Sequence, residues 1–191
     1  MNVHDRIAEC LRALRDARGW SLETLAEHSG VSRSNISLIE RGQSSPTAVV
    51  LDKLATALAV PLSSLFGESG ENEAPSPIAR AADQALWTDP ASGYQRRQLS
   101  PALRSPALRS PIQLVEVHFP PGARVHFDTS ARDADIHQQI WLLEGVMEIT
   151  AGTTAWRLEA GDCVAMRLDS PMQFHNPTRR PARYLVALST R

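Results

Sequence analysis

The sequence predicts two domains of different class, an all-α domain followed by an all-β domain. Up to about residue 66 the apolar residues recur every three or four positions, which is the spacing of amphipathic helices. From about residue 78 they alternate with polar residues in short runs separated by turns, which is the pattern of strands. The segment GESGENEAPSP between them has the composition of a solvated linker. We therefore expect a helical domain at 1–66, a linker at 67–77 and a β domain at 78–191.

Composition indicates an ordinary globular protein. The chain of 191 residues is 42% apolar and 21% charged, with a formal net charge of −1. No run approaches the roughly 18 apolar residues of a membrane span, and the N-terminus is charged and helical in pattern, so we expect a cytoplasmic protein. Cys10 and Cys163 lie far apart and outside any CxxC spacing, so we expect two reduced, packed thiols and no disulfide or zinc ribbon.

The first helix is indicated by Val3, Ile7, Leu11 and Leu14, which recur at intervals of four, four and three residues. Gly19 marks its end, because glycine readily adopts the left-handed conformation that closes a helix.

Two short helices are expected between residues 21 and 42. Ser21 and Ser32 are candidate N-caps, and each has an apolar residue before it and another four positions after it, as a hydrophobic staple requires. Gly30 and Gly42 are positioned to end the two helices. The exposed side and N-terminal end of the second helix should carry Ser32, Arg33, Ser34, Asn35, Ser37 and Leu38.

Two more helices complete the expected set of five. Ser45 is a candidate cap, with Pro46 at the first helical position, where the missing N–H costs nothing. The helix that follows should pack through Leu51, Leu54, Ala55 and Leu58. Pro61 should open a last short helix that ends near Phe66.

The helical segment resembles the lambda-repressor-like helix-turn-helix of xenobiotic-response-element (XRE) family regulators. The resemblance lies in the stretch SLETLAEHSGVSRSNISLIERGQSSPTAVVLDKLATALAVPLSSLF. The resemblance runs from about residue 3 to residue 66 and implies that the second central helix enters the major groove of DNA. It implies base-facing positions for Arg33, Ser34 and Leu38. It implies phosphate or supporting positions for Ser32, Asn35, Ser37, Arg41, Gln43 and Ser45. The alternative is that these residues form an ordinary solvated helix face.

Bulk charge gives no support to DNA binding, because residues 1–66 contain seven basic and seven acidic residues. One copy should therefore bind DNA weakly, and a pair of copies is needed for specific binding.

The β domain is expected to be a sandwich or barrel of short strands. Its candidate strands are 95–99, 112–119, 140–143, 146–150, 154–158, 162–166, 172–175 and 183–188. Residues 100–111 contain SPALR twice, and the prolines favour a surface loop between strands.

Two segments of the β domain resemble the two motif regions of a small cupin, a double-stranded β-helix of jelly-roll type. They are HQQIWLLEGVMEI and LEAGDCVAMRLDSPMQFHNP. Cupins commonly hold a metal with histidines and one glutamate. The glutamate position falls on Gln138 and a histidine position on Met172. The two remaining histidine positions fall on Arg132 and Ala134 by one count, or on Asp128 and Ser130 by another. Amide and thioether groups are poor ligands for iron, manganese or zinc, so we expect neither metal nor cofactor. A site made by His126, His137 and His175 in another register stays open.

Strand alternation predicts an interior that is mostly apolar and suited to an organic ligand. Its expected lining is His126, Gln138, Ile140, Leu142, Met172 and Phe174. A plain core is the alternative. Trp141 and Trp156 should point outward, against the linker, the other domain or a second subunit.

Together these features predict a transcriptional regulator that is not an enzyme. We expect it to bind double-stranded operator DNA as a homodimer, to act as a repressor, and to take a small-molecule effector in the β domain. Two alternatives remain. One is a metal-dependent cupin enzyme with an accessory helix-turn-helix, and the other is a DNA-binding protein whose β domain only dimerises.

Overall fold

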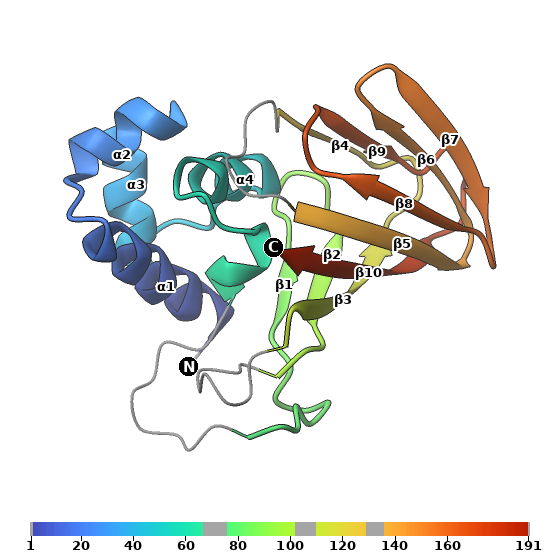
Figure 1. Ribbon diagram of the computed structural model, residues 1–191, viewed down its shortest axis with the longest axis horizontal. Helices are drawn as coiled ribbons and strands as arrows, with labels where there is room; N and C mark the ends of the chain where they lie inside the picture. Colours follow the sequence, from blue (N-terminus) through green and yellow to red (C-terminus); the bar gives the residue numbers. More distant parts are fainter. Residues whose placement is uncertain (1, 67–75, 102–109, 129–135, 191) are drawn as a thin grey trace. The chain divides into compact units, whose positions relative to one another are not determined.

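The computed structural model describes residues 2–66, 76–101, 110–128 and 136–190 (Figure 1). It divides into two compact units, Met1–Ala74 and Pro75–Arg191. Most of the predicted linker at 67–77 and most of the SPALR repeat lie outside the described residues. Within the described part of the chain, no helix is long and apolar enough to cross a membrane.

The first unit is helical, as predicted, and residues 2–66 form four α-helices and one 3₁₀ helix in place of the five expected helices. They are α1 (Val3–Ala17), α2 (Leu22–Ser29), α3 (Arg33–Glu40), α4 (Ala48–Ala57) and the 3₁₀ helix η1 (Leu62–Phe66). The core consists of apolar side chains that recur at helical spacing and are almost inaccessible to solvent: Ile7, Leu11, Leu25, Ile36, Ile39, Leu51, Leu54, Leu58 and Leu65.

The predicted caps of the two central helices are confirmed. The Ser21 side chain accepts a hydrogen bond from the Thr24 N–H, and Ser32 caps α3 in the same way. The prediction that Ser45 caps the next helix with Pro46 at its first position is wrong. Thr47 is the N-cap, and its hydroxyl accepts from the Val50 N–H at 3.3 Å. Pro46 instead precedes the cap and is buried, which places it in the apolar position of a staple.

The second unit consists of two antiparallel sheets, as predicted (Figure 1). The six-stranded sheet has the order β1 (Leu86–Thr88), β2 (Gln95–Gln98), β3 (Ile112–Phe119), β10 (Ala182–Thr190), β5 (Ile136–Glu144) and β8 (Cys163–Arg167). The four-stranded sheet has the order β4 (Arg124–Phe127), β9 (Met172–His175), β6 (Val146–Ala151) and β7 (Thr154–Glu159). β1 and β4 were not predicted, because runs of three and four residues are too short to show alternation.

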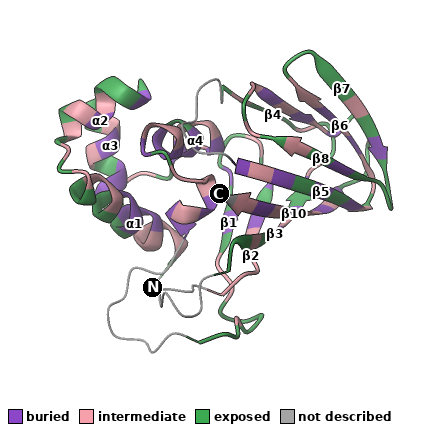
Figure 2. Cartoon of the chain, viewed as in Figure 1, coloured by how far each residue is buried: buried purple, intermediate pink, exposed green. Residues whose placement is uncertain are grey.

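The strand order identifies the second unit as a jelly roll. From β3 onward, β3-β10-β5-β8 form one sheet and β4-β9-β6-β7 the other, which is the double-sheet Greek-key arrangement of cupins. Buried and exposed residues alternate along most of the strands, most clearly in β5 (Figure 2). The inner faces carry a run of aromatic rings in successive contact: Trp87, Tyr94, Phe119, Tyr184, Phe174 and Phe127.

Three side chains of the β unit lie differently from expectation. His126 is exposed on the outer face of β4, because buried Val125 takes the inward direction there. Trp156 is only half-buried and lies opposite Ile149, which is inaccessible, so it belongs to the inner face. Cys163 is exposed and unpacked, whereas Cys10 is buried as predicted.

Candidate nucleic-acid interface

Helix α3 is held by one face and offers the other to solvent. Ile36 and Ile39 are buried in the helical core, with exposed fractions of 0% and 1%. Of the nine residues predicted to contact DNA, Asn35 and Ser37 are half-buried and the rest are exposed: Ser32, Arg33, Ser34, Leu38, Arg41, Gln43 and Ser45. A helix anchored through its inner face, with its N-terminal residues exposed to solvent, has the geometry of a major-groove reader.

The N-terminal end of α3 is capped by hydrogen bonds among Ser32, Ser34 and Asn35. The Ser32 hydroxyl accepts from the Asn35 N–H at 3.3 Å, and the hydroxyls of Ser32 and Ser34 lie 3.3 Å apart. This capping leaves further backbone N–H groups in the first turn of α3, and such groups favour an approaching phosphate or base acceptor.

The C-terminal end of α3 closes in a Schellman motif, which sets the direction of the following loop. Gly42 has φ of 66°, its N–H donates to the Ile39 carbonyl, and the Gln43 N–H donates to the Leu38 carbonyl. The Arg41 side chain folds back, with Nε donating to the Ser37 carbonyl at 3.1 Å. A cation at this end also suits the helix dipole.

Arg33 has a partner that sequence reasoning missed. Its Nε lies 3.7 Å from a Glu23 carboxylate oxygen, and both side chains are about two thirds exposed. Glu23 stands in the first turn of α2, ten positions earlier in the chain. The contact depends on how α2 crosses α3, which neither helix specifies alone. Because both partners are solvated, the pair is weak and Arg33 can leave it.

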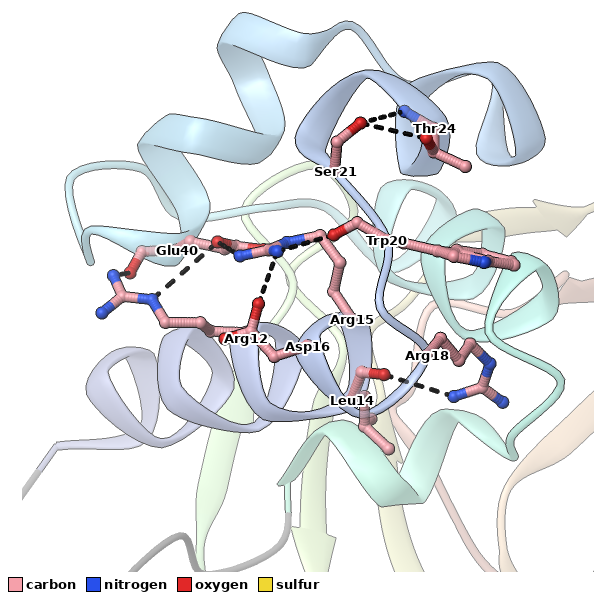
Figure 3. Close-up of polar contacts among 9 residues, drawn as sticks. All are labelled: Arg12, Leu14, Arg15, Asp16, Arg18, Trp20, Ser21, Thr24 and Glu40. Atoms are coloured by element: carbon pink, nitrogen blue, oxygen red, sulfur yellow. Dashed lines mark hydrogen bonds and ion pairs between the residues drawn. The ribbon is translucent and has the colours of Figure 1, made fainter.

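A buried ion pair fixes α3 to α1 (Figure 3). The Glu40 side chain is only 5% exposed and accepts two hydrogen bonds from Arg15, Nε to Oε1 at 2.7 Å and Nη2 to Oε2 at 2.8 Å. Arg15 also donates to Asp16 and to the Trp20 carbonyl, and Arg12 donates to the Glu40 carbonyl. The hydrogen bond to Glu40 is the main reason that the pKa of Arg15 is raised. The sequence offered no signal for this pair, because its members are 25 residues apart.

The predicted ligand residues of the β unit, apart from His126, lie on its two inner faces. Ile140, Leu142 and Met172 are at most 1% exposed, and Phe174 is 8% exposed and stacks on Tyr184 with ring centroids 6.3 Å apart. Gln138 is buried among them by strand register, and its Nε2 has no hydrogen-bond partner within the described residues.

Arg96 is a second polar group of this interior, and sequence reasoning missed it. It lies on the inner side of β2 and is 7% exposed. Burial lowers the pKa of its guanidinium, and burial raises the pKa of the neighbouring Tyr184 phenol well above its usual value. The polar run QRRQ is typical of a solvated edge strand. Only its pairing register with β3 places the Arg96 side chain on the inner face.

The three histidines considered for a metal do not converge. His126 and His175 lie on the outer face of the four-stranded sheet, and His137 lies on the outer face of the other sheet. His175 Nδ1 is 2.9 Å from the Glu148 carboxylate, and His126 Nε2 is 3.3 Å from Asp128. In the described part of the chain no three His, Cys, Asp or Glu side chains are grouped to hold a metal ion. Of the cupin ligand positions, Ser130, Arg132 and Ala134 lie outside the described residues.

Comparison with known proteins points to one class for the helical unit. The helix-turn-helix family pattern matches residues 11–65. The HTH-type transcriptional regulator SutR of Escherichia coli K12 is 50% identical over 65 residues, 34% of this chain and 36% of SutR. The chain thus spans about a third of the length of SutR. The HTH-type transcriptional regulator SinR of Bacillus licheniformis is 31% identical over 93 residues, 48% of this chain and 84% of SinR.

One solved structure has the same fold along almost the entire chain. It is an HTH_3 family transcriptional regulator from Vibrio cholerae, with a TM-score of 0.73 and 24% identity. The similarity covers 98% of this chain and 96% of the Vibrio chain.

Proposed function

Because this chain belongs to the XRE-type helix-turn-helix transcriptional regulators, with a cupin-type domain after the helix-turn-helix, we propose that it reads operator DNA with α3 and represses transcription. The observation that carries the proposal is the outward side of α3, where Arg33, Ser34 and Leu38 are exposed on a helix fixed through Ile36 and Ile39. A protein with this role acts on chromosomal DNA, in the cytoplasm.

Arg33 and Ser34 are the proposed base readers. An arginine guanidinium makes paired hydrogen bonds to guanine O6 and N7, and a serine hydroxyl serves either donor or acceptor edges. Leu38, one turn further along α3, is suited to the methyl group of thymine. The remaining predicted residues surround these three and are suited to phosphate oxygens or to supporting the readers. They are Ser32, Asn35, Ser37, Arg41, Gln43 and Ser45.

The active form is proposed to be a homodimer. The helical unit has equal numbers of basic and acidic residues, so a single copy gains little from general attraction to DNA. Two copies read two half-sites about one helical turn apart, which doubles the specific contacts.

The β unit is proposed to bind a small organic effector rather than to catalyse a reaction. Its interior has an apolar lining with two buried polar groups, the Gln138 amide and the Arg96 guanidinium, and the positive charge of the guanidinium favours an acidic molecule. Such a ligand changes DNA binding only if it has different affinities for two arrangements of the dimer, one that fits the operator and one that does not. A β domain that only dimerises, or one that holds a catalytic metal, are the competing roles.

The operator is found by selecting random DNA on the full chain, and Arg33→Ala then tests the reading helix. We expect this variant to lose about 1–3 kcal/mol of operator binding and to accept more bases at one position per half-site. Lys53→Ala is the control, since it removes one exposed positive charge from α4. Equal affinity and base preference in wild type and Arg33→Ala would remove Arg33 from the reading set.

The role of the β unit is tested by calorimetry of the full chain with a panel of organic acids. Binding stabilises the β unit by RT ln(1 + L/Kd), where L is the ligand concentration, so its unfolding temperature should rise with the logarithm of the ligand concentration once that concentration exceeds Kd. A panel without any stabilising member favours the purely dimerising role. Stoichiometric iron or manganese in the purified protein would establish the metal-dependent alternative.

A further inference from the structure

Glu23 and Arg33 form an ion pair between the two helices of the helix-turn-helix. Arg33 is the first residue of α3, and Glu23 lies in the first turn of α2. Arg33 Nε lies 3.7 Å from Glu23 Oε2, and the two side chains are 65% and 67% exposed. A carboxylate next to a residue proposed to contact DNA opposes the attraction between the protein and the phosphates. Glu23 therefore works against affinity, so any benefit that it brings to DNA binding is one of selectivity.

The backbone around this ion pair is fixed by capping and by core packing. The Ser21 hydroxyl accepts a hydrogen bond from the Thr24 N–H at 3.0 Å, which caps the turn that carries Glu23 (Figure 3). Leu25 of α2 and Ile36 of α3 are inaccessible to solvent in the helical core. The fold thus sets the distance between the starts of the two helices, and the ion pair can change only through movement of its side chains.

The carboxylate lies at one side of the Arg33 guanidinium and leaves the end of the guanidinium open. Its oxygen is beside Nε, and neither Nη1 nor Nη2 donates a hydrogen bond to any of the described residues. Paired hydrogen bonds to guanine O6 and N7 need two donors side by side, which Nη1 and Nη2 provide. Arg33 can therefore contact guanine while its Nε stays next to Glu23.

A contact between Arg33 and a phosphate has a different cost. Phosphate oxygens and the Glu23 carboxylate carry like charges and repel each other, so a guanidinium that binds a phosphate leaves the acid. Guanine O6 and N7 are neutral acceptors and carry no such penalty. The ion pair thus costs little when Arg33 contacts guanine, and it costs its full strength when Arg33 turns to a phosphate. An exposed pair of this kind is worth about two- to fivefold in an equilibrium constant.

We propose that Glu23 is a positioning residue that directs Arg33 to a guanine in each operator half-site and away from phosphate oxygens. The inference rests on the proposed function, in which α3 reads operator DNA, and it adds the base that Arg33 reads. A phosphate contact contributes affinity on every sequence without base preference, whereas a guanine contact specifies one base pair. Glu23 lowers the affinity for all DNA and lowers it most where the guanine is absent.

The base preference of the full chain tests the positioning role. Fluorescence anisotropy compares the selected operator with variants that carry each other base at the position where Arg33→Ala loses discrimination. The wild type should prefer guanine there. Glu23→Gln should reduce this preference about two- to fivefold, because the released Arg33 gains phosphate contacts on every sequence. Glu27→Gln is the matched control, since Glu27 is exposed one turn further along α2 and the variant loses the same charge.

Salt dependence shows where the released arginine binds. Each additional phosphate contact steepens the fall of log K with log salt by about 0.9. On DNA without the guanine, Glu23→Gln should therefore have a slope steeper than that of Glu27→Gln by about 0.9 per bound copy. Adding Arg33→Ala to Glu23→Gln should remove this difference, whereas Arg33→Ala alone should leave the slope on the same DNA nearly unchanged. A purely structural role of Glu23 does not give this pattern, and circular dichroism establishes that each variant is folded.

The outcomes separate this inference from the proposed function. An Arg33→Ala protein that keeps the affinity and base preference of the wild type refutes both. If Arg33→Ala loses the preference while Glu23→Gln keeps it in full, the positioning role is overturned and α3 remains the reading helix. An equal loss of preference in Glu23→Gln and Glu27→Gln assigns the effect to general charge and also overturns the role. So does a base other than guanine at this position, or an equal salt slope in the two glutamine variants. A lower guanine preference and a steeper slope in Glu23→Gln alone support the proposal.

Discussion

Replacing Glu40 by glutamine tests how the reading helix is fixed to the rest of the helical unit. The substitution keeps size and shape but removes the charge that accepts two hydrogen bonds from Arg15. One amide oxygen can still accept from the guanidinium, while the amide NH₂ meets a group that only donates.

The expected cost follows from burial. Glu40 and Arg15 side chains are 5% and 12% exposed, so the arginine left behind cannot turn to water without leaving its place. Removing one partner of a buried pair costs about 3–5 kcal/mol. Arg15 retains its contacts with Asp16 and the Trp20 carbonyl, which places the expected loss near the lower end, at about 3 kcal/mol.

Differential scanning calorimetry of the full chain measures this loss. A cost of about 3 kcal/mol in a unit of this size lowers the unfolding temperature by about 12–24 °C. The transition of the β unit should stay in place. Glu27→Gln is the matched control, because Glu27 is exposed on α2 and should change stability by at most about 0.5 kcal/mol. The double variant Arg15→Met with Glu40→Met should regain most of the stability, since both charges are then removed from the core.

A Glu40→Gln protein no less stable than Glu27→Gln would show that the buried pair does not hold α3 in place. A methionine pair as unstable as the single glutamine variant would show that the cost comes from lost packing and not from an uncompensated charge.

Three further predictions address DNA affinity, a helix end and acid stability. Glu23→Gln should raise operator affinity about two- to fivefold at low salt, because it releases Arg33 from its ion pair and removes a negative charge near DNA. Fluorescence anisotropy measures the affinity, and the gain should vanish when Arg33 is also replaced by alanine. Ala59→Gly should stabilise the helical unit by about 1 kcal/mol in thermal unfolding, since Ala59 has φ of 47° at the C-terminal end of α4 and closes a Schellman motif; a loss of stability would contradict this. The hydrogen bond from His175 lowers the pKa of Glu148, so its contribution is present above the unfolded carboxyl value of about 4.3 and is lost as the pH falls through the lower folded value. Glu148→Gln should therefore show a shallower loss of unfolding temperature below about pH 4.3 than the wild type, and parallel curves would contradict the assignment.

The helical unit shows how far local pattern reaches. Ser21, Ser32 and Gly42 act through hydrogen bonds to residues within five positions, so the sequence predicted both central helices and the end of α3. The same local pattern predicted Ser45 as the N-cap of α4, and the structure has Thr47 there. Ser45 and Thr47 are both good caps, and the choice between them depends on burying Pro46 in the core.

Among the described residues of the β unit, alternation predicted eight of the ten strands, because a strand with one buried face records that face in its own sequence. Strands β1 and β4 are too short to do so. The direction of His126 also escaped prediction, since four residues do not say which of two alternating sets faces inward.

The sequence by itself determined the two fold classes, the helix-turn-helix with its exposed side, and the inner faces of the long strands. All of these follow from contacts between residues near in the chain or from a repeated pattern. Only the tertiary structure decided that Glu40 pairs with Arg15, that Glu23 meets Arg33 and that Arg96 points into the core. Each of these depends on which segments become neighbours, and a pairing across 10 to 40 or more residues leaves no periodic trace in the sequence.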